Sequence, residues 1–210
     1  MTFYRMKMFT ELFADYFHNF DVLYQSLSPK YNRESVFQTG EGAGASGSFF
    51  FFSHDKKFII KTIPKEELDE LLRLLPKLKD HYERNPRSLL SKIIGLFTVK
   101  TKAMSEVHLM LMENILRFKE PEKLKFIFDL KGSSVNREVK GPTKASTTLK
   151  DINFIREHRK SEKFIQFSKK DRYKVLRALL KDVEFLRSNG IMDYSLLLGV
   201  EETDATIEQD

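Results

Sequence analysis

A glycine pattern and a downstream lysine are the first residues whose types and spacing predict chemistry. The pattern G-x-G-x-x-G runs from Gly42 to Gly47, and glycine lets backbone N–H groups approach phosphate oxygens closely. A dinucleotide-binding turn of this pattern leads into a helix. Here four phenylalanines follow at 49–52, and then a turn and residues 57–63, which favour strands. We therefore expect a glycine hairpin between strands, with Lys61 placed to contact a bound phosphate. A flexible turn followed by a surface lysine is the alternative.

A second candidate for chemistry is Asp193, which follows a predicted helix and precedes an apolar segment. Residues 168–187 carry leucine and valine at helical spacing, with Ser168 and Asp171 resembling a capping box. The pair Asn189-Gly190 is typical of a helix end. A buried helix that ends just before an aspartate held among apolar residues is how kinases present their catalytic base. A capping or turn role for this aspartate is the alternative.

The elements that must position these residues occur in the order of a kinase fold. We expect helices at 11–24, 66–75 and 168–187, strands at 93–100, 107–113 and 124–128, and a polar connector at 26–38. Pro64 should break the lysine strand, and Pro76 should end or kink the helix at 66–75, with a further turn at 78–82. Residues 132–150 lack periodicity and predict a long loop. The predicted fold class is α+β: a kinase-like N-terminal lobe with an antiparallel β-sheet, and the beginning of a C-terminal lobe.

Composition narrows the classes of protein and partner. The 210 residues carry 36 Lys and Arg against 30 Asp and Glu, a net charge of +6, which suits an anionic partner such as phosphates or an acidic membrane leaflet. No RNA-binding sheet motif, zinc finger or arginine-rich arm accompanies the charge, so we do not expect nucleic acid. No apolar run is long enough to span a membrane. The chain has no cysteine, which suits a reducing compartment.

Four segments together resemble the phosphatidylinositol phosphate kinase family. They are GASGSFF at 44–50, IKT at 60–62, DLKGS at 129–133 and MDYSLL at 192–197. The last two match family signatures, and the similarity runs from about Phe9 to the end of the chain. The resemblance implies that residues 1–210 are part of a kinase domain whose glycine loop is 42–48. Segments 71–76 and 129–134 look most like enzymes that make phosphatidylinositol 4,5-bisphosphate from the 4-phosphate.

The resemblance implies a nucleotide site for ATP. It places Gly44, Ser46 and Gly47 over the phosphates, Lys61 on the α- and β-phosphates with Glu67 orienting it, and Met112, Asn114 and Ile115 in a hinge beside the adenine. For Glu67 the alternative is a solvated helix charge.

The resemblance also implies two catalytic residues in the second half of the chain. Lys131 would lie near the phosphates, and Asp193 would accept the proton of the inositol hydroxyl. A carboxylate suits this role because phosphoryl transfer needs a positioned acceptor more than a strong base.

Two departures bear on the Mg²⁺ that such a kinase uses with ATP. Leu198 stands where protein kinases place a metal-binding asparagine, although the MDYSLL signature also lacks it. The family's Ile-Ile-Asp metal segment and its lipid-selecting loop do not occur in the 210 residues. The metal ligands therefore stay unknown, and we expect little kinase activity from these residues alone.

The resemblance implies a lipid kinase that acts on a phosphoinositide. It would work as a cytoplasmic, peripheral protein at an anionic membrane surface, with the plasma membrane as the expected site and a homodimer as a possible assembly. The alternative is a catalytically inactive scaffold that binds phosphoinositide or nucleotide.

Overall fold

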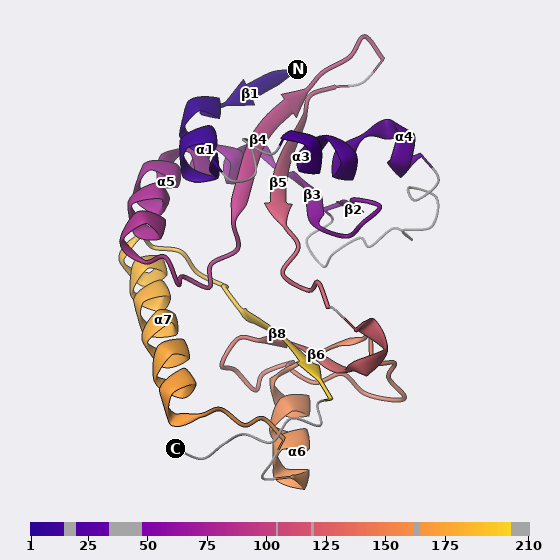
Figure 1. Ribbon diagram of the computed structural model, residues 1–210, viewed down its shortest axis with the longest axis vertical. Coiled ribbons are helices and arrows are strands. Elements are labelled where there is room, and N and C mark those ends of the chain that lie inside the picture. The colour runs from indigo at the N-terminus through magenta and orange to yellow at the C-terminus, as the bar shows by residue number, and fades with distance from the viewer. Residues whose placement is uncertain (15–19, 34–47, 104, 119, 162–163, 203–210) are drawn as a thin grey trace. The chain divides into compact units, whose positions relative to one another are not determined.

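The computed structural model describes residues 1–14, 20–33, 48–103, 105–118, 120–161 and 164–202 (Figure 1). The chain divides into two compact units, Met1–Arg117 and Phe118–Asp210, which we call the N-terminal and C-terminal units. Each unit has its own β-sheet and its own helices. The α+β class is therefore confirmed. Among the described residues, no helix combines the length and apolarity needed to cross a membrane.

The N-terminal unit is built on a five-stranded antiparallel sheet, as expected for a kinase-like N-terminal lobe. Its strands lie in the order β1-β4-β5-β3-β2. Their bounds are β1 Thr2–Tyr4, β2 Phe50–Phe52, β3 Phe58–Ile63, β4 Ile93–Val99 and β5 Val107–Glu113. The helices of this unit are α1 Met6–Leu12, α3 Phe20–Leu27, α4 Pro29–Asn32 and α5 Lys65–Arg84. The predicted strands at 57–63, 93–100 and 107–113 are confirmed to within a residue at either end.

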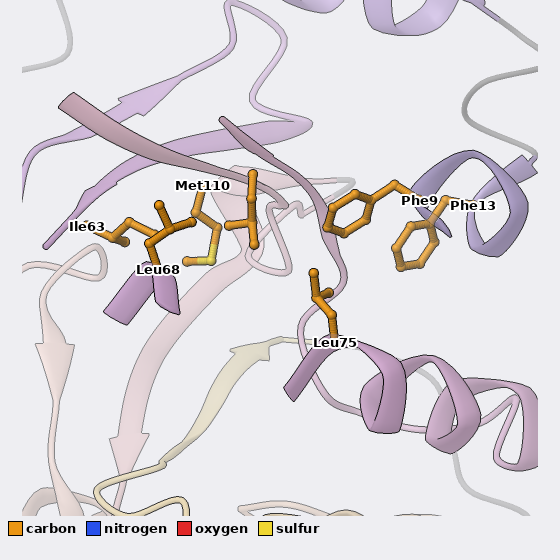
Figure 2. Close-up of a cluster of buried hydrophobic side chains, with 7 residues drawn as sticks. Phe9, Phe13, Ile63, Leu68, Leu75 and Met110 are labelled. Atoms are coloured by element: carbon orange, nitrogen blue, oxygen red, sulfur yellow. The ribbon is translucent and has the colours of Figure 1, made fainter. Parts of the chain in front are cut away.

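Helices α1 and α5 meet the sheet in one buried cluster (Figure 2). The cluster contains Leu68 and Leu75 of α5, Ile63 of β3 and Phe9 of α1. Phe13, Leu96 and Met110 complete the buried set. Removing each such side chain from water contributes about 1.5–3 kcal/mol, which fixes α5 against the strand that carries Lys61.

The prediction of a single helix at 11–24 is wrong. Helix α1 ends at Leu12, where Phe13 leaves the helical conformation with φ −120° and ψ 44°, and α3 begins at Phe20. Phe13 packs in the α1–α5 cluster, whereas Leu23 of α3 packs with Phe58 and Ile94 in a second cluster. Of the apolar residues that suggested one helix, Phe13 and Leu23 therefore belong to different clusters.

The further helical turn expected at 78–82 is confirmed as part of α5, which continues to Arg84 with leucines buried on both sides of Pro76. Pro76 therefore does not end its helix, and a kink there stays a prediction. The connector at 26–38 contains the short helix α4, which the Ser28-Pro29 pair starts: Ser28 Oγ accepts a hydrogen bond from Lys30 N–H at 3.3 Å. Ser before Pro is a common helix start, so this signal was present in the sequence.

The C-terminal unit has a three-stranded sheet. Strand β6 Leu124–Leu130 lies between β7 Thr148–Leu149, which runs parallel to it, and β8 Leu196–Glu201, which runs antiparallel. A short 3₁₀ turn, η2 Pro121–Lys123, precedes β6, and the helices are α6 Asp151–Lys160 and α7 Lys169–Ser188. The loop prediction at 132–150 holds up to β7. Helix α6 was not predicted, because its buried residues are the polar Asp151 and Asn153 and its sequence has no apolar repeat.

Helix α7 is confirmed, but its expected burial is wrong. Ser168 Oγ accepts a hydrogen bond from Asp171 N–H at 3.1 Å at its start, and Gly190 has φ 72° just beyond its end. The only residues of α7 that are buried are Ala178 and Asp182, while Leu180 is 71% exposed. Helical spacing predicts that one face is apolar, but it does not supply the element that covers that face.

Candidate functional site

The glycine-rich segment leads into the sheet directly opposite Lys61. Gly44, Ser46 and Gly47 lie outside the described residues, so their predicted contact with phosphates stays a prediction. Phe49 N–H donates to Thr62 Oγ1 at 2.9 Å, and Thr62 N–H donates to Phe49 O at 3.0 Å. Phe50, the next residue along, is paired with Lys61.

Lys61 and Glu67 form an ion pair within the N-terminal unit. Lys61 Nζ lies 3.0 Å from Glu67 Oε1 and 3.4 Å from Oε2. Pro64 separates the strand from the helix, so the first turn of α5 returns toward β3, and the fully buried Leu68 holds that turn in place. The structure thus brings together two residues that the sequence assigned to one task. An ammonium group held on a central strand by a carboxylate is directed at a defined point, where it can contact a phosphate.

The predicted hinge residues lie at the end of β5 and differ in their surroundings. Met112 is in the sheet between Ile59 and Ile93. Asn114 is buried and holds the preceding hairpin: its N–H donates to Lys57 O at 2.9 Å, and its Nδ2 donates to Lys56 O at 2.8 Å. Ile115 is exposed. The amide N–H of Asn114 is therefore already used inside the protein, which leaves Ile115 as the better candidate for a contact with adenine.

The turn between β2 and β3 is held by a carboxylate that the sequence reasoning missed. Asp55 accepts hydrogen bonds from Ser26 Oγ and Ser53 Oγ, both at 2.7 Å, and its Oδ2 lies 3.0 Å from Lys57 Nζ. Burial opposes the charged form, but these hydrogen bonds prevail and hold the pKa of Asp55 below its ordinary value. Asp55 thereby joins α3 to the hairpin whose second strand carries Lys61.

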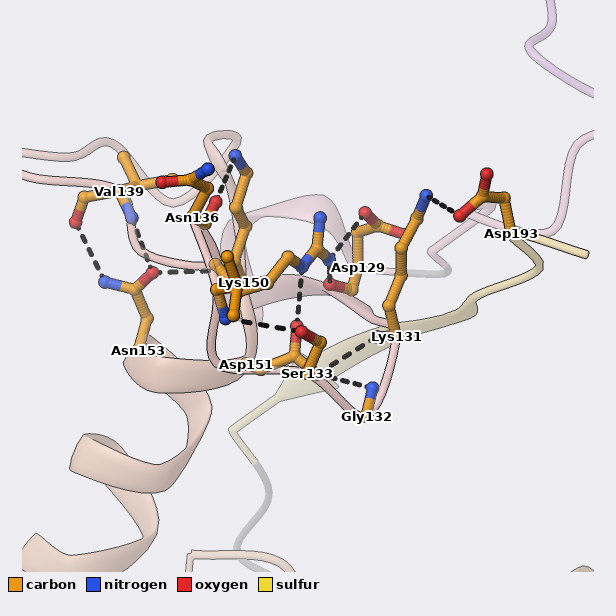
Figure 3. Close-up of polar contacts among 12 residues, drawn as sticks. Asp129, Lys131, Gly132, Ser133, Asn136, Val139, Lys150, Asp151, Asn153 and Asp193 are labelled. Atoms are coloured by element: carbon orange, nitrogen blue, oxygen red, sulfur yellow. Dashed lines mark hydrogen bonds and ion pairs between the residues drawn. The ribbon is translucent and has the colours of Figure 1, made fainter.

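The C-terminal unit brings the two signature motifs side by side. Strands β6 and β8 are paired with Asp129 opposite Leu197 and Leu130 opposite Leu196, so the residues that follow β6 and precede β8 meet at one edge. Lys131 Nζ lies 3.7 Å from Asp193 Oδ1 there (Figure 3). Asp193 has φ 57°, and its side chain is 93% exposed. An exposed carboxylate beside an ammonium group can accept a proton from a hydroxyl group placed against it.

A largely buried arginine side chain, 12% exposed, lies between two carboxylates and was also missed by the sequence reasoning. Arg137 donates from Nε to Asp151 Oδ2 at 2.8 Å and from Nη2 to Asp129 Oδ2 at 2.9 Å. Burial raises the pKa values of both carboxyl groups, but the hydrogen bonds they accept outweigh it, so each pKa stays below its ordinary value. Arg137 stands in the segment without periodicity, where only its charge distinguished it.

The described residues do not form a metal site by themselves. Across the ranges that the structure describes, no three His, Asp or Glu side chains gather closely enough to hold a metal ion. We therefore assign no residue to Mg²⁺.

Comparison with known proteins accounts for these features together. The sequence model of the family described as Phosphatidylinositol-4-phosphate 5-Kinase matches residues 6–210. The chain belongs to this family. The resemblance carried by the DLKGS and MDYSLL signatures is thereby confirmed.

Curated relatives of this phosphatidylinositol-4-phosphate 5-kinase family member come from distant organisms. A probable phosphatidylinositol phosphate kinase of Dictyostelium discoideum is 42% identical over 171 residues, 80% of this chain and 23% of the relative. A phosphatidylinositol 4-phosphate 5-kinase of Schizosaccharomyces pombe is 36% identical over 84% of this chain and 23% of its own length. The human type-1 beta 5-kinase is 34% identical over 79% of this chain and 30% of its own length. The chain thus spans between about a fifth and a third of the length of these relatives.

Proposed function

We propose that this chain is part of a lipid kinase that transfers the γ-phosphate of ATP to the inositol ring of phosphatidylinositol 4-phosphate, which yields phosphatidylinositol 4,5-bisphosphate. Membership of the family and the names of the relatives support this class of reaction. The observation that carries the proposal is the Lys61–Glu67 ion pair at 3.0 Å, on the strand that pairs with the exit of the glycine-rich segment.

The proposed roles are those that the family resemblance implies for each residue. Lys61 contacts the α- and β-phosphates of ATP and Glu67 orients it, with Gly44, Ser46 and Gly47 over the phosphates and Met112, Asn114 and Ile115 beside the adenine. Asp193 accepts the proton of the attacking inositol hydroxyl, and Lys131 lies near the transferred phosphate. The 3.7 Å separation of Lys131 Nζ and Asp193 Oδ1 supports this division, because it places the ammonium group and the carboxylate close enough to contact the same pair of reacting groups.

Mg²⁺ is the proposed cofactor, and it would neutralise charge on the phosphates. We propose that the protein is peripheral at the cytoplasmic face of a membrane, and that this membrane is the plasma membrane. A net charge of +6 favours binding to an anionic lipid surface. A homodimer is proposed as the assembly, and nucleic acid is not proposed as a partner.

The first test is the thermal protection of the chain by ATP. A ligand at 100 times its Kd stabilises the folded state by about 2.7 kcal/mol. We expect ATP to raise the Tm of the wild-type chain, and Lys61→Met to remove most of that rise because the phosphate loses its cation. Lys65→Met is the matched control, since Lys65 pairs with Asp69 on the exposed face of α5. An equal ATP shift in wild type and Lys61→Met would show that the phosphate site is assigned wrongly.

A second measurement separates the kinase from the alternative, a catalytically inactive phosphoinositide- or nucleotide-binding scaffold. Vesicles that contain phosphatidylinositol 4-phosphate are incubated with the protein, labelled ATP and Mg²⁺, and the bisphosphate is quantified. A scaffold can bind ATP or the lipid, but only the kinase forms product. Protection by ATP without any product from the longest available form of the protein would favour the scaffold.

A further inference from the structure

The start of helix α6 holds the backbone on which Lys131 lies. Asp151, the first residue of α6, accepts hydrogen bonds through Oδ1 from Lys131 N–H at 3.0 Å and from Gly132 N–H at 2.8 Å (Figure 3). Asp151 is buried, with 7% of its surface exposed. A carboxylate in this position fixes two successive peptide units, because a charged acceptor makes stronger hydrogen bonds than a neutral one.

The second oxygen of the same carboxylate holds Arg137. Arg137 Nε donates to Asp151 Oδ2 at 2.8 Å, and the same guanidinium reaches Asp129 on the strand before Lys131. The Arg137 side chain is only 12% exposed. Asp151 is buried, so loss of Arg137 would leave its charge uncompensated, and the positions of the three groups depend on one another.

Other hydrogen bonds from the start of α6 hold the loop backbone further along the chain, at Arg137 and Val139. Ile152 N–H donates to Arg137 O at 3.0 Å. Asn153 accepts from Val139 N–H through Oδ1 and donates to Val139 O through Nδ2, both at 2.9 Å. Residues 131–147 form no regular helix or strand, so these side-chain bonds take the place of a backbone ladder.

We propose that Asp151 is a positioning residue: its carboxylate fixes the Lys131-Gly132 backbone and, through Arg137, the Asp129 side chain, and so holds the Lys131 ammonium beside Asp193. The proposal rests on the proposed function of Lys131 and Asp193. Asp151 itself contacts neither the lipid nor ATP in this scheme. Its importance to the reaction lies in the geometry it imposes, since a small misplacement of a reacting group lowers the rate steeply.

Amide hydrogen exchange in the ¹⁵N-labelled chain tests this directly. Asn at position 151 has one acceptor oxygen and one donor nitrogen, so it cannot accept both from the two amides and from Arg137. We expect Asp151→Asn to speed exchange at Lys131 and Gly132 about 10-fold to 100-fold, as loss of hydrogen bonds to a charged acceptor implies. Asp171→Asn is the control, because Asp171 lies in the first turn of α7 and pairs with Lys174. Unchanged exchange in Asp151→Asn, or an equal change in Asp171→Asn, overturns the proposal.

If Asp151→Asn does not fold, the wild-type chain supplies the decisive measurement. The amide shifts of Lys131 and Gly132 should titrate with the same midpoint as the Asp151 side-chain carboxyl carbon, at a pH below the ordinary value for aspartate. Burial by itself would raise the pKa of Asp151, but the hydrogen bonds from Arg137, Gly132 and Lys131 outweigh it and lower that pKa overall. Amide shifts that do not follow the Asp151 titration overturn the proposal.

Kinetics in a preparation that phosphorylates lipid distinguish failure of this inference from failure of the proposed function. Asp151→Asn should lower kcat about 10-fold to 100-fold, as misplacement of a reacting group does, and leave the KM for ATP within about twofold, as loss of a transition-state interaction does. Normal kcat in Asp151→Asn together with low kcat in Lys131→Ala overturns the positioning role alone. Normal kcat in Lys131→Ala overturns the proposed function of Lys131, and the exchange rates still decide whether Asp151 holds its backbone.

Discussion

At the scale of single residues, the backbone of Asp193 is the most informative feature. Its φ of 57° lies in the left-handed region, which residues other than glycine occupy uncommonly and which aspartate and asparagine tolerate best. The position lies three residues before β8, and its carboxylate is exposed toward solvent beside Lys131. A conformation of this kind suits a residue that must present its side chain at an edge of the sheet.

The prediction at this scale concerns Asp193→Asn. Asparagine keeps the shape of the side chain and tolerates the same backbone conformation, but it cannot accept the proton. In a preparation that phosphorylates lipid, we expect turnover to fall about 10²–10⁴-fold, the usual contribution of a positioned general base. ATP binding should change little, because Lys61 and the hinge residues belong to the N-terminal unit.

Turnover and ATP binding are measured in the same purified variant, with its Tm as a control for folding. Near-normal turnover would refute the catalytic role. Loss of ATP binding together with a lowered Tm would instead favour a capping or turn role for Asp193.

At the scale of elements, the hairpin of β2 and β3 depends on contacts that converge on its turn. Asp55 joins it to α3, Asn114 joins it to the end of β5, and Asn32 Oδ1 accepts a hydrogen bond from His54 N–H at 2.8 Å. Three separate segments therefore hold a turn of a few residues. Polar contacts of this kind set the position of the strand that carries Lys61, beyond what strand pairing alone determines.

Stability of the N-terminal unit should depend on the ionised form of Asp55. The pKa of Asp55 is lower in the folded protein than its ordinary value, so its contribution is present at neutral pH. That contribution is lost as pH falls below the unfolded-state pKa, ordinarily about 3.9, toward the lower folded-state pKa. We expect Asp55→Asn to lower the free energy of unfolding by about 1–3 kcal/mol at pH 7, the range for hydrogen bonds to a charged group.

Denaturant unfolding from pH 7 to pH 2 checks this prediction. The difference between wild type and Asp55→Asn should shrink as the pH falls. Asp69→Asn is the control, because Asp69 lies on the exposed face of α5 and its loss should change stability by no more than about 0.5 kcal/mol. A difference between wild type and Asp55→Asn that stays constant over this pH range would show that ionisation of Asp55 does not matter.

At the scale of the whole molecule, the described residues form two units, each with its own sheet. Both buried hydrophobic clusters with their surrounding residues lie in the N-terminal unit. The C-terminal unit instead relies on aromatic contacts, such as Phe128 against Phe154 at a centroid distance of 5.2 Å, and it leaves the leucine face of α7 exposed. The two units therefore differ in how much apolar surface each can bury by itself.

We expect residues 1–117 to fold on their own. Every residue of the two clusters lies within this segment, so separation from the rest of the chain leaves its core intact. Thermal unfolding followed by circular dichroism should show a cooperative transition, and ATP should raise its midpoint if Lys61 and Glu67 act as proposed. Residues 118–210, measured alongside, should have a lower midpoint. A featureless melt of residues 1–117 would contradict the division into units.

Much of the fold could be read from local patterns. The strands around Lys61, the cap at Ser168 and the stop at Gly190 follow from residue type and spacing, because backbone propensity and hydrophobic periodicity act over a few residues. Helix α6 was not predicted because its buried residues, Asp151 and Asn153, are polar and form hydrogen bonds with the loop that precedes the helix. The segment 11–24 was taken as one helix because spacing alone cannot tell which of two cores a side chain joins.

The sequence by itself determined the family, through the DLKGS and MDYSLL signatures, and with the family the identities of the candidate residues Lys61, Lys131 and Asp193. Only the tertiary structure decided which side chains meet. Pairing of β6 with β8 brings Lys131 to Asp193, and the start of α6 brings Asp151 to the Lys131 backbone and to Arg137. These contacts join residues far apart in the chain, so they depend on strand register and loop closure, which no local pattern of residues encodes.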